Sequence, residues 1–300
     1  MSGESIEMGF QLWTSPVTGY RRHGTRLSDF NNVLGCRILA SDICEPLKCC
    51  AAGAPANKIR AELERLDFTI AGVREVEGGP VIGYVEGAAL FYGKVRDHLH
   101  DLTEVAVIPR GTDIVALLGT LKGNPFAYVE GESGIEAIVT WADINKPMVR
   151  IYIFGLISLL EMHLSFWIFK EFSNGEWENM LADERVEAAV SVQEIRRAVG
   201  QELTLIQCLQ LCDKRDLVLR SDKLMGLFGL SSRRAGGRFL RSVETLRNSL
   251  AHSQYDLVSD NAWVDLLSLV GQIQRAVELS DVQVENDSME SSAEFSGLLW

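Results

Sequence analysis

One pattern occurs twice within residues 38–147, and this internal repeat constrains the fold more than any other feature of the sequence. In each copy, a stretch with helical spacing of apolar residues precedes two apolar strands that a glycine-containing turn separates. The helices are expected at residues 56–66 and 112–121, and the strands at residues 69–76, 81–85, 126–130 and 135–140. A helix and paired strands that recur in this way predict two similar α/β units, packed as a pair.

Two motifs in each copy resemble those of a known family. Residues 40–47 (ASDICEPL) and 83–85 (GYV) are similar to the opening and closing strands of a CBS repeat. Residues 107–109 (VIP) and 138–143 (IVTWAD) are similar to those of a second CBS repeat. The resemblance implies a tandem CBS pair, with clefts of the kind in which adenine nucleotides bind in many members. The implied bounds are residues 35–147 for the pair, and about 38–95 and 100–147 for the repeats.

A nucleotide site is expected in the second repeat. Family members with a bound adenosine phosphate often carry Thr or Ser after the last strand and Asp three residues later, and Thr140 and Asp143 match. The resemblance implies that Asp143 accepts hydrogen bonds from the ribose hydroxyls while Thr140 contacts the phosphate. The first repeat has Glu86 and Ala89 instead, so one site for AMP, ATP or a cyclic adenylate is expected. Ala137 departs from the family, which tends to have Gly there.

Beyond Pro147 the strand pattern stops. Apolar residues then fall at spacings of three and four, which predicts a bundle of about five helices. These helices are expected at residues 148–172, 177–199, 203–219, 239–250 and 263–279. The fold class is therefore expected to be α+β, with tandem CBS repeats followed by an all-α bundle over residues 148–280.

A short motif stands near the end of the fourth expected helix. Arg247 is followed by Asn248 and, five positions after the arginine, by His252. In an all-helical region this order resembles the signature of HEPN domains, many of which are metal-independent endoribonucleases. The resemblance implies that Arg247 and His252 are the catalytic pair and that Asn248 orients the phosphate or the imidazole. An imidazole titrating near neutrality can move the proton of a 2'-hydroxyl, while a guanidinium stabilises the phosphorane.

The motif also implies partners. HEPN sites usually form at a two-fold interface, so a single motif per chain implies a homodimer, with RNA as the substrate. Glu161 in the first helix would be costly to bury alone, and Arg247 is its candidate partner. Glu161 is therefore expected to orient the catalytic site and not to transfer a proton.

A non-catalytic interpretation stays open beside the leading hypothesis of a nucleotide-regulated, metal-independent endoribonuclease. Asp143 can simply cap a helix in a scaffold pair. Arg247 can pair with Glu244 on the helix surface, with His252 as a helix cap or a core residue. The chain is then a nucleotide-sensing dimerisation and interaction module with a degenerate HEPN domain.

The net charge of −12 argues against a general nucleic-acid-binding surface, and DNA is not an expected partner. The 29 basic residues split as 14 in residues 1–149 and 15 in residues 150–300, and the 41 acidic residues split as 19 and 22. One local cluster of arginines is opposed only by Glu244; it comprises Arg233, Arg234, Arg238, Arg241 and Arg247. This cluster is either a solvated helix face or a surface that steers RNA.

The two ends of the chain are expected to lie outside the folded regions. The polar, turn-rich composition of residues 1–34 predicts an extended arm. The composition of residues 281–300 predicts a disordered acidic tail that can bind a protein partner. The N-terminus lacks the order of a secretory signal, and the six cysteines form no CxxC pair. A cytoplasmic protein with reduced thiols and no metal site is therefore expected. Residues 151–169 approach the length of a membrane span, but Glu161 and His163 at their centre favour a buried helix and no membrane contact.

Overall fold

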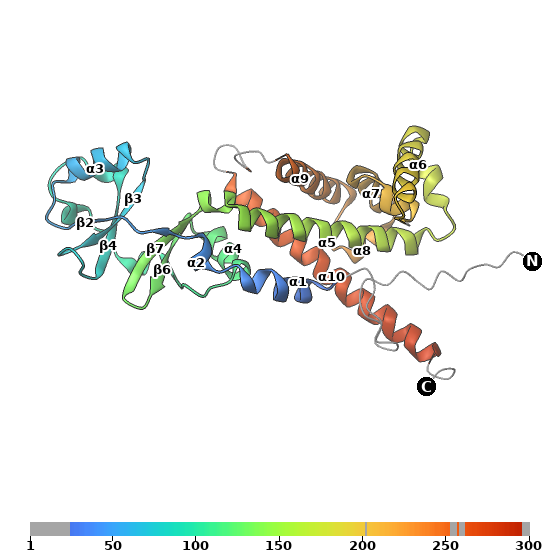
Figure 1. The fold of residues 1–300 in the computed structure, drawn as a ribbon, viewed down its shortest axis with the longest axis horizontal. Helices are drawn as coiled ribbons and strands as arrows, with labels where there is room; N and C mark the ends of the chain where they lie inside the picture. Colours follow the sequence, from blue (N-terminus) through green and yellow to red (C-terminus); the bar gives the residue numbers. More distant parts are fainter. Residues whose placement is uncertain (1–24, 202, 253–256, 258–261, 296–300) are drawn as a thin grey trace, which may run out of the picture. The chain divides into compact units, whose positions relative to one another are not determined.

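In the computed structural model the chain folds into two compact units (Figure 1). The structure describes residues 25–201, 203–252, 257 and 262–295. The repeat unit consists of Leu34–Arg150 together with Asp260–Leu267. The helical unit contains the described residues of the remaining segments, Met1–Val33, Ile151–Ser259 and Ser268–Trp300.

Two β-α-β-β segments form the body of the repeat unit. The first comprises β2 (Cys49–Ala51), α3 (Ala56–Arg65), β3 (Ile70–Arg74) and β4 (Val81–Glu86). The second comprises β5 (Ala106–Pro109), α4 (Ile114–Gly123), β6 (Phe126–Gly131) and β7 (Gly134–Thr140). In both segments the first strand pairs in parallel with the second, which pairs antiparallel with the third. The repeated order of helix and strands that the sequence predicted is confirmed.

The opening stretch of each repeat pairs with the closing strand of the other. Ahead of the first repeat, β1 (Glu45–Pro46) pairs antiparallel with β7, and Glu45 lies opposite Ile138. Ahead of the second repeat, His100 and Tyr84 of β4 exchange two backbone hydrogen bonds of 2.9 and 3.1 Å. Because Tyr84 and Ile138 occupy the same place in their strands, the exchange is reciprocal. The two repeats therefore form one pseudo-symmetric body.

An aromatic cluster joins the two sheets, whose strand orders are β2-β3-β4 and β1-β7-β6-β5. Tyr84 of β4 packs against Phe126 and Tyr128 of β6, with ring centroids 5.5 to 6.1 Å apart and edge-on geometry. The first repeat also has an apolar core of its own, made by Ala52, Ala56, Leu63, Ala71, Val73, Val85, Leu90 and Val95. Burial of these side chains stabilises the strand exchange.

Helices alone build the helical unit within the described residues. They are α1 (Leu27–Val33), α5 (Pro147–Glu171), α6 (Asp183–Ala198), α7 (Leu211–Val218), α8 (Asp222–Leu227), α9 (Arg233–Ala251) and α10 (Trp263–Phe295). Short 3-10 helices precede α6 and α7, namely η6 (Glu176–Met180) and η7 (Leu205–Cys208). These turns replace the first residues of the two longer helices that the apolar spacing predicted. The α+β class with a helical C-terminal region is confirmed.

α5 is buried along most of its length, as the sequence indicated. Its Tyr152, Ile153, Leu156 and Leu164 side chains are fully enclosed. In the described part of the chain, α5 is the one helix long and apolar enough to cross a membrane, and 67% of its most apolar window is buried within the protein. The apolar character of α5 therefore serves the core of this unit.

A buried polar cluster fixes the middle of α10 against α5. The ring Nδ1 of His163, which is fully buried, lies 2.7 Å from the hydroxyl of Ser280. The same hydroxyl accepts a 2.7 Å hydrogen bond from the indole N–H of Trp167. Burial lowers the pKa of His163 to about 4 and raises the pKa of the neighbouring Asp281 to about 6. At neutral pH the imidazole of His163 is therefore neutral.

The expectations of an extended arm and a disordered tail are wrong where the structure describes these segments. α1 forms within the expected arm, and α10 continues through the expected tail to Phe295. The backbone N–H of Leu27 donates to Asp281 Oδ2 at 2.9 Å, and Arg26 pairs with Glu285 at 3.1 Å. Val284 in this segment is only 3% exposed. The prediction of disorder was based on the acidic composition of the segment and overlooked this apolar residue at helical spacing. The remaining parts, residues 1–24 and 296–300, lie outside the described residues.

Candidate functional site

Thr140 and Asp143 lie together at the end of the closing strand of the second repeat. Thr140 ends β7, and Asp143 lies in the 3-10 helix η5 (Trp141–Asn145) that follows it. The backbone N–H and the hydroxyl of Thr140 donate to Asp143 Oδ2 at 2.7 and 3.1 Å. Asp143 is only 6% exposed, so this capping arrangement fixes its carboxylate. The structure brings together the two residues that the sequence singled out.

Lys146 completes this cluster, although the sequence analysis did not identify it. Its Nζ lies 2.9 Å from Asp143 Oδ1 and donates at 2.5 Å both to Glu45 Oε1 and to the carbonyl of Ile43. Burial disfavours the ammonium, but the hydrogen bonds to Glu45 and Asp143 outweigh burial and raise the pKa of Lys146. The signal in the sequence that could have identified Lys146 was its position three residues after Asp143.

The cluster has the donors and acceptors that a ribose phosphate requires. An ionised carboxylate offers about four lone-pair sites, and Asp143 uses three of them on Thr140 and Lys146. One site remains to accept a ribose hydroxyl, and a second becomes free if Lys146 turns toward a phosphate. An ammonium donates well to phosphate oxygens, so Lys146 suits that role.

The first repeat has no such cluster at the equivalent place. Glu86 lies opposite the first residue of β3, as Thr140 lies opposite the first residue of β6, so these two positions correspond. Three residues further along each chain segment, Ala89 corresponds to Asp143, and after three more residues Tyr92 corresponds to Lys146. Glu86 is exposed and no side chain caps the 3-10 helix that follows it. The asymmetry between the repeats therefore holds in the structure as well as in the sequence.

Arg247, Asn248 and His252 lie at the C-terminal end of α9, and all three are exposed. Arg247 Nη1 donates to Asn248 Oδ1 at 3.4 Å, and His252 ends the helix with its backbone N–H bonded to the carbonyl of Asn248. With 3.6 residues per turn, five residues place two side chains about 140° apart around a helix. Arg247 and His252 therefore face different sides of α9, and the structure does not bring them together within one chain.

The expected partnership of Glu161 with Arg247 is wrong. Glu161 Oε1 lies 2.9 Å from the Nζ of Lys214 on α7, a lysine whose side chain is only 3% exposed. A buried ammonium requires an acid beside it, so this pair ties α5 to α7. Reading the sequence could not find it, because 53 residues separate the partners.

The alternative pairing of Arg247 with Glu244 is also wrong. Glu244 Oε2 accepts a 2.8 Å hydrogen bond from Arg215 of α7. The one acidic residue among the α9 arginines is thus turned toward a neighbouring helix. Arg233 pairs with Asp222 of α8 at 2.8 Å. The exposed face of α9 carries four further arginines, namely Arg234, Arg238, Arg241 and Arg247.

The described residues include no group of three or more His, Cys, Asp or Glu that could hold a metal ion. All six cysteines are free thiols. Burial raises the pKa of Cys50 to about 11, and burial likewise raises the pKa of Cys49. These thiols are therefore poor nucleophiles at neutral pH.

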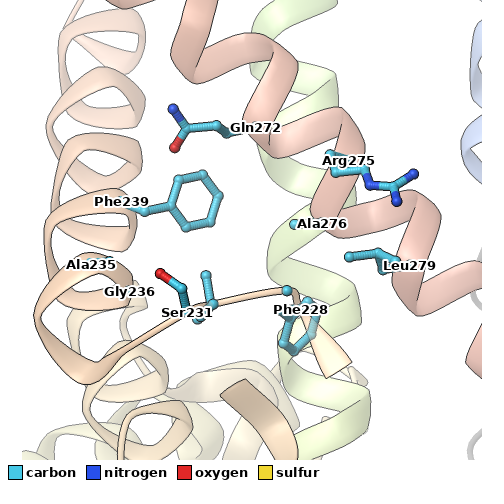
Figure 2. Close-up of a pocket in the computed structure, with 11 residues that line it drawn as sticks. Phe228, Ser231, Ala235, Gly236, Phe239, Gln272, Arg275, Ala276 and Leu279 are labelled. Atoms are coloured by element: carbon cyan, nitrogen blue, oxygen red, sulfur yellow. The ribbon is translucent and has the colours of Figure 1, made fainter. Parts of the chain in front are cut away.

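A cavity of about 410 Å³ lies between the start of α9 and the middle of α10 (Figure 2). Figure 2 shows Phe239 extending from α9 toward the helix that carries Gln272 and Arg275. Phe228 and Leu279 also line this cavity, whose walls are largely apolar. Arg275 is paired with Glu278 at 3.2 Å, so the cavity offers no set of groups for catalysis.

Solved structures of CBS-domain proteins are similar to part of the chain. A hemolysin-like protein containing a CBS domain from Oenococcus oeni is 13% identical, with a TM-score of 0.32 over 40% of this chain and 96% of its own. A CBS domain-containing protein from Bacillus anthracis is 14% identical, with a TM-score of 0.34 over 38% of this chain and 94% of its own. The CBS domain of the bacterial CNNM/CorC family Mg2+ transporter in complex with ATP is 16% identical, with a TM-score of 0.33 over 40% and 92%. The sequence matches no protein-family model and no curated protein.

Proposed function

We propose that the repeat unit binds one adenine nucleotide per chain and that the chain is a nucleotide-responsive regulatory protein. The observation that carries this proposal is the cluster that Thr140 and Lys146 form around the buried carboxylate of Asp143, which stands at only one of two equivalent positions. A ribose phosphate needs a fixed carboxylate for its hydroxyls and a cation for its phosphate. The second repeat supplies both, and the first repeat supplies neither.

Binding has a direct route to the backbone of the repeat unit. Lys146 holds the stretch before the first repeat through the carbonyl of Ile43 and through Glu45, which is part of β1. If a phosphate draws the ammonium away, these two hydrogen bonds are lost. Because β1 pairs with β7, the exchanged opening segment is then held by its backbone hydrogen bonds alone. Nucleotide binding is thereby coupled to the segment that interlocks the repeats.

Isothermal titration calorimetry with AMP, ATP and a cyclic adenylate tests this proposal on the full chain. We expect saturable binding of at least one of them, with a stoichiometry of one per chain. Adenosine without phosphate should bind more weakly, because it makes no use of Lys146. Two equal sites per chain, or no binding of any of the three nucleotides at millimolar concentration, would contradict the proposal.

A second candidate function concerns the helical unit, for which we propose metal-independent RNA cleavage. The exposure of Arg247, Asn248 and His252 at one end of a positively charged helix favours it. Since Arg247 and His252 face different sides of α9, an Arg–His pair has to be completed by a second chain. The cytoplasmic homodimer that the motif implies belongs to this candidate. Glu161 has no part in it, because its carboxylate is committed to Lys214.

Incubation of the purified protein with total RNA in EDTA separates the two roles of the helical unit. Cleavage should leave 2',3'-cyclic phosphate ends, because the neighbouring 2'-hydroxyl is the nucleophile that an Arg–His site promotes. His252→Ala should reduce the rate by about 10² to 10⁴-fold. Absence of cleavage, or unchanged cleavage by His252→Ala, leaves the helical unit as a non-catalytic interaction module.

A further inference from the structure

α9 presents one line of polar side chains to solvent over its whole length. From Arg234 to His252, the residue that caps the helix, six residues follow one another at steps of four, three, four, three and four. At 3.6 residues per turn, these steps keep all six within about 40° of one line along the helix. We call this line the α9 stripe. Its residues, all of them exposed, are Arg234, Arg238, Arg241, Thr245, Asn248 and His252.

The α9 stripe lies on the side of the helix opposite its apolar face. That face consists of buried side chains, among them Phe239, Val243, Leu246 and Leu250. Figure 2 shows Phe239 extending from α9 toward α10. Because this packing fixes α9 on one side only, the stripe on the other side keeps a regular spacing and faces solvent.

The positive charge of the α9 stripe is not neutralised within the described residues. Glu244, the single acidic residue of α9, lies about 80° away from the stripe and pairs with Arg215 of α7 at 2.8 Å. Arg233 lies about 100° away from the stripe on the same helix and is paired with Asp222. The three arginines of the stripe, by contrast, have no acidic partner among the described residues.

The composition of the α9 stripe favours a nucleic acid over a lipid surface. Protein contacts to phosphate and sugar oxygens come from arginine and lysine together with hydroxyl and amide side chains, and the stripe consists of these types and a histidine. Every residue of α9 is described, and none is an exposed large apolar side chain. A basic helix that lies on a membrane, however, presents apolar side chains beside its cations.

The two uncharged residues of the stripe suit a ribose phosphate. Asn248 uses its Oδ1 on Arg247, so its amide N–H groups can donate to a phosphate oxygen. The hydroxyl of Thr245 donates to the carbonyl of Arg241 at 3.0 Å, and its oxygen can still accept a hydrogen bond from a ribose hydroxyl. The stripe therefore offers both donors for phosphate and an acceptor for a sugar.

We propose that the α9 stripe binds the sugar-phosphate backbone of a single-stranded RNA. A single line of contacts, about 27 Å long at 1.5 Å per residue, follows one strand, whereas a duplex presents two. The arginines contact phosphates along the first part of α9, and His252 stands at the end of the path. The choice of RNA rests on the RNA cleavage proposed for the helical unit, in which His252 acts on a 2'-hydroxyl. Binding by the stripe does not itself require cleavage.

Fluorescence anisotropy of the full chain in EDTA, with a labelled 2'-O-methyl oligouridine of about 12 nucleotides, tests binding. The methyl groups block attack by the neighbouring oxygen, so binding is measured without cleavage. The logarithm of the affinity should fall with the logarithm of the salt concentration with a slope of about −2, as expected for three phosphate contacts on a single strand. Absence of binding at low salt, or equally tight binding of the matching duplex, would overturn the proposal. Displacement of the oligouridine by phosphatidylserine vesicles would show a lipid surface instead and would also overturn it.

Substitutions on α9 test whether the stripe makes the contacts. Arg238→Gln should weaken binding about fivefold at about 0.1 M salt and reduce the steepness of the salt dependence by about 0.7. Arg238→Gln/Arg241→Gln should weaken binding about 25-fold under the same conditions. Arg233→Gln is the matched control, because it removes the same charge from the same helix outside the stripe, and it should change the affinity less than about twofold. Equal losses for Arg238→Gln and Arg233→Gln would overturn the proposal.

Cleavage of unmodified RNA separates this proposal from the function on which it rests. Binding through the stripe by a wild type that cuts no RNA supports the stripe and contradicts the catalytic role of His252. Cleavage at the wild-type rate by Arg238→Gln/Arg241→Gln, with RNA below saturation, supports that catalytic role and overturns the stripe. If both proposals hold, the double variant should cut about 25-fold more slowly at low RNA concentration and recover as the RNA concentration rises.

Discussion

The two repeats have the same strand order, and each exchanges its opening stretch with the other. The side chains at the ends of their closing strands, however, are different. In the second repeat, Thr140 and Lys146 both bind the buried carboxylate of Asp143. In the first repeat, the matching positions hold an exposed acid, a methyl group and an exposed ring, at Glu86, Ala89 and Tyr92. Strand pairing and apolar packing thus suffice to repeat the fold. A ligand site depends on a few polar side chains that the fold itself does not require.

The largest expected difference between the repeats concerns nucleotide affinity. Asp143→Ala removes the acceptor for the ribose, and hydrogen bonds to a charged group are each worth about 1.5–3 kcal/mol. We expect a loss of at least about 100-fold in the affinity for AMP by calorimetry, since two such bonds are at stake. Glu86→Ala in the first repeat should leave the affinity unchanged. Equal losses for both variants would break the comparison.

The second expected difference lies in how tightly the exchanged stretches approach the closing strands. A Cβ at Gly83 would meet the carbonyl oxygen of His100 at 2.5 Å and the side chain of Leu99 at 2.6 Å. Gly83→Ala should therefore lower the free energy of unfolding by about 1–3 kcal/mol in urea titrations. Ala137 occupies the matching place in the second repeat, opposite Pro46 of β1. Ala137→Gly should cost no more than about 1 kcal/mol, and a larger cost there than at Gly83 would contradict the assigned geometry.

Much of the repeat unit could be predicted from sequence, because its signals are local. Apolar spacing located both helices and all the longer strands, and a motif of four residues located Thr140 and Asp143. Lys146 was missed because its importance depends on Glu45, which is 101 residues away and reaches it only through the pairing of β1 with β7. Long-range strand exchange leaves no periodic signal.

The helical unit was less predictable for the same reason. Its helices follow from apolar spacing, but its ion pairs join residues far apart in the chain. Lys214 was not recognised as the partner of Glu161, and Arg215 was not recognised as the partner of Glu244. The C-terminal part of α10 was misjudged because composition was weighed above periodicity. One buried valine, Val284, and one backbone hydrogen bond to Asp281 order it.

A smaller effect is expected from Lys146 than from Asp143. Lys146→Gln should lower the affinity for AMP about tenfold, the value of one charge-assisted hydrogen bond. The affinity for adenosine should not fall, because the change removes a competitor for Asp143. Calorimetry with both ligands measures the difference. An equal loss for adenosine would show that Lys146 supports only the fold.

Lys146 also predicts a pH dependence of stability. The raised pKa of Lys146 means that its ion pairs contribute fully at neutral pH, below the ordinary lysine pKa, and are lost as the pH rises through the folded-state pKa. The wild type should therefore lose its stability advantage over Lys146→Gln at strongly alkaline pH in urea titrations. An advantage that stays constant through that range would contradict the assigned pairing.

The smallest expected effect comes from transferring the cap to the first repeat. Glu86→Thr/Ala89→Asp should reproduce the hydrogen bonds of Thr140 and Asp143 and raise stability by about 0.5–1 kcal/mol. The double variant should still bind one nucleotide, because Tyr92 stands where the second repeat has its lysine. Adding Tyr92→Lys should introduce a second, weaker site. Calorimetry and urea titration measure both outcomes, and a second site in the double variant would show that Lys146 is dispensable.

Hydrogen exchange read by mass spectrometry tests the central claim most directly, because it reports on both repeats in one experiment. At saturating AMP or ATP, we expect slower hydrogen exchange in residues 138–146, which carry the cluster. The exchange rate of β1 should also change, because nucleotide binding alters the hydrogen bond between Lys146 and Glu45. Residues 84–92, the matching stretch of the first repeat, should exchange at the same rate with and without nucleotide. Equal protection of the two stretches, or protection of residues 84–92 alone, would contradict the assignment of the site to the second repeat.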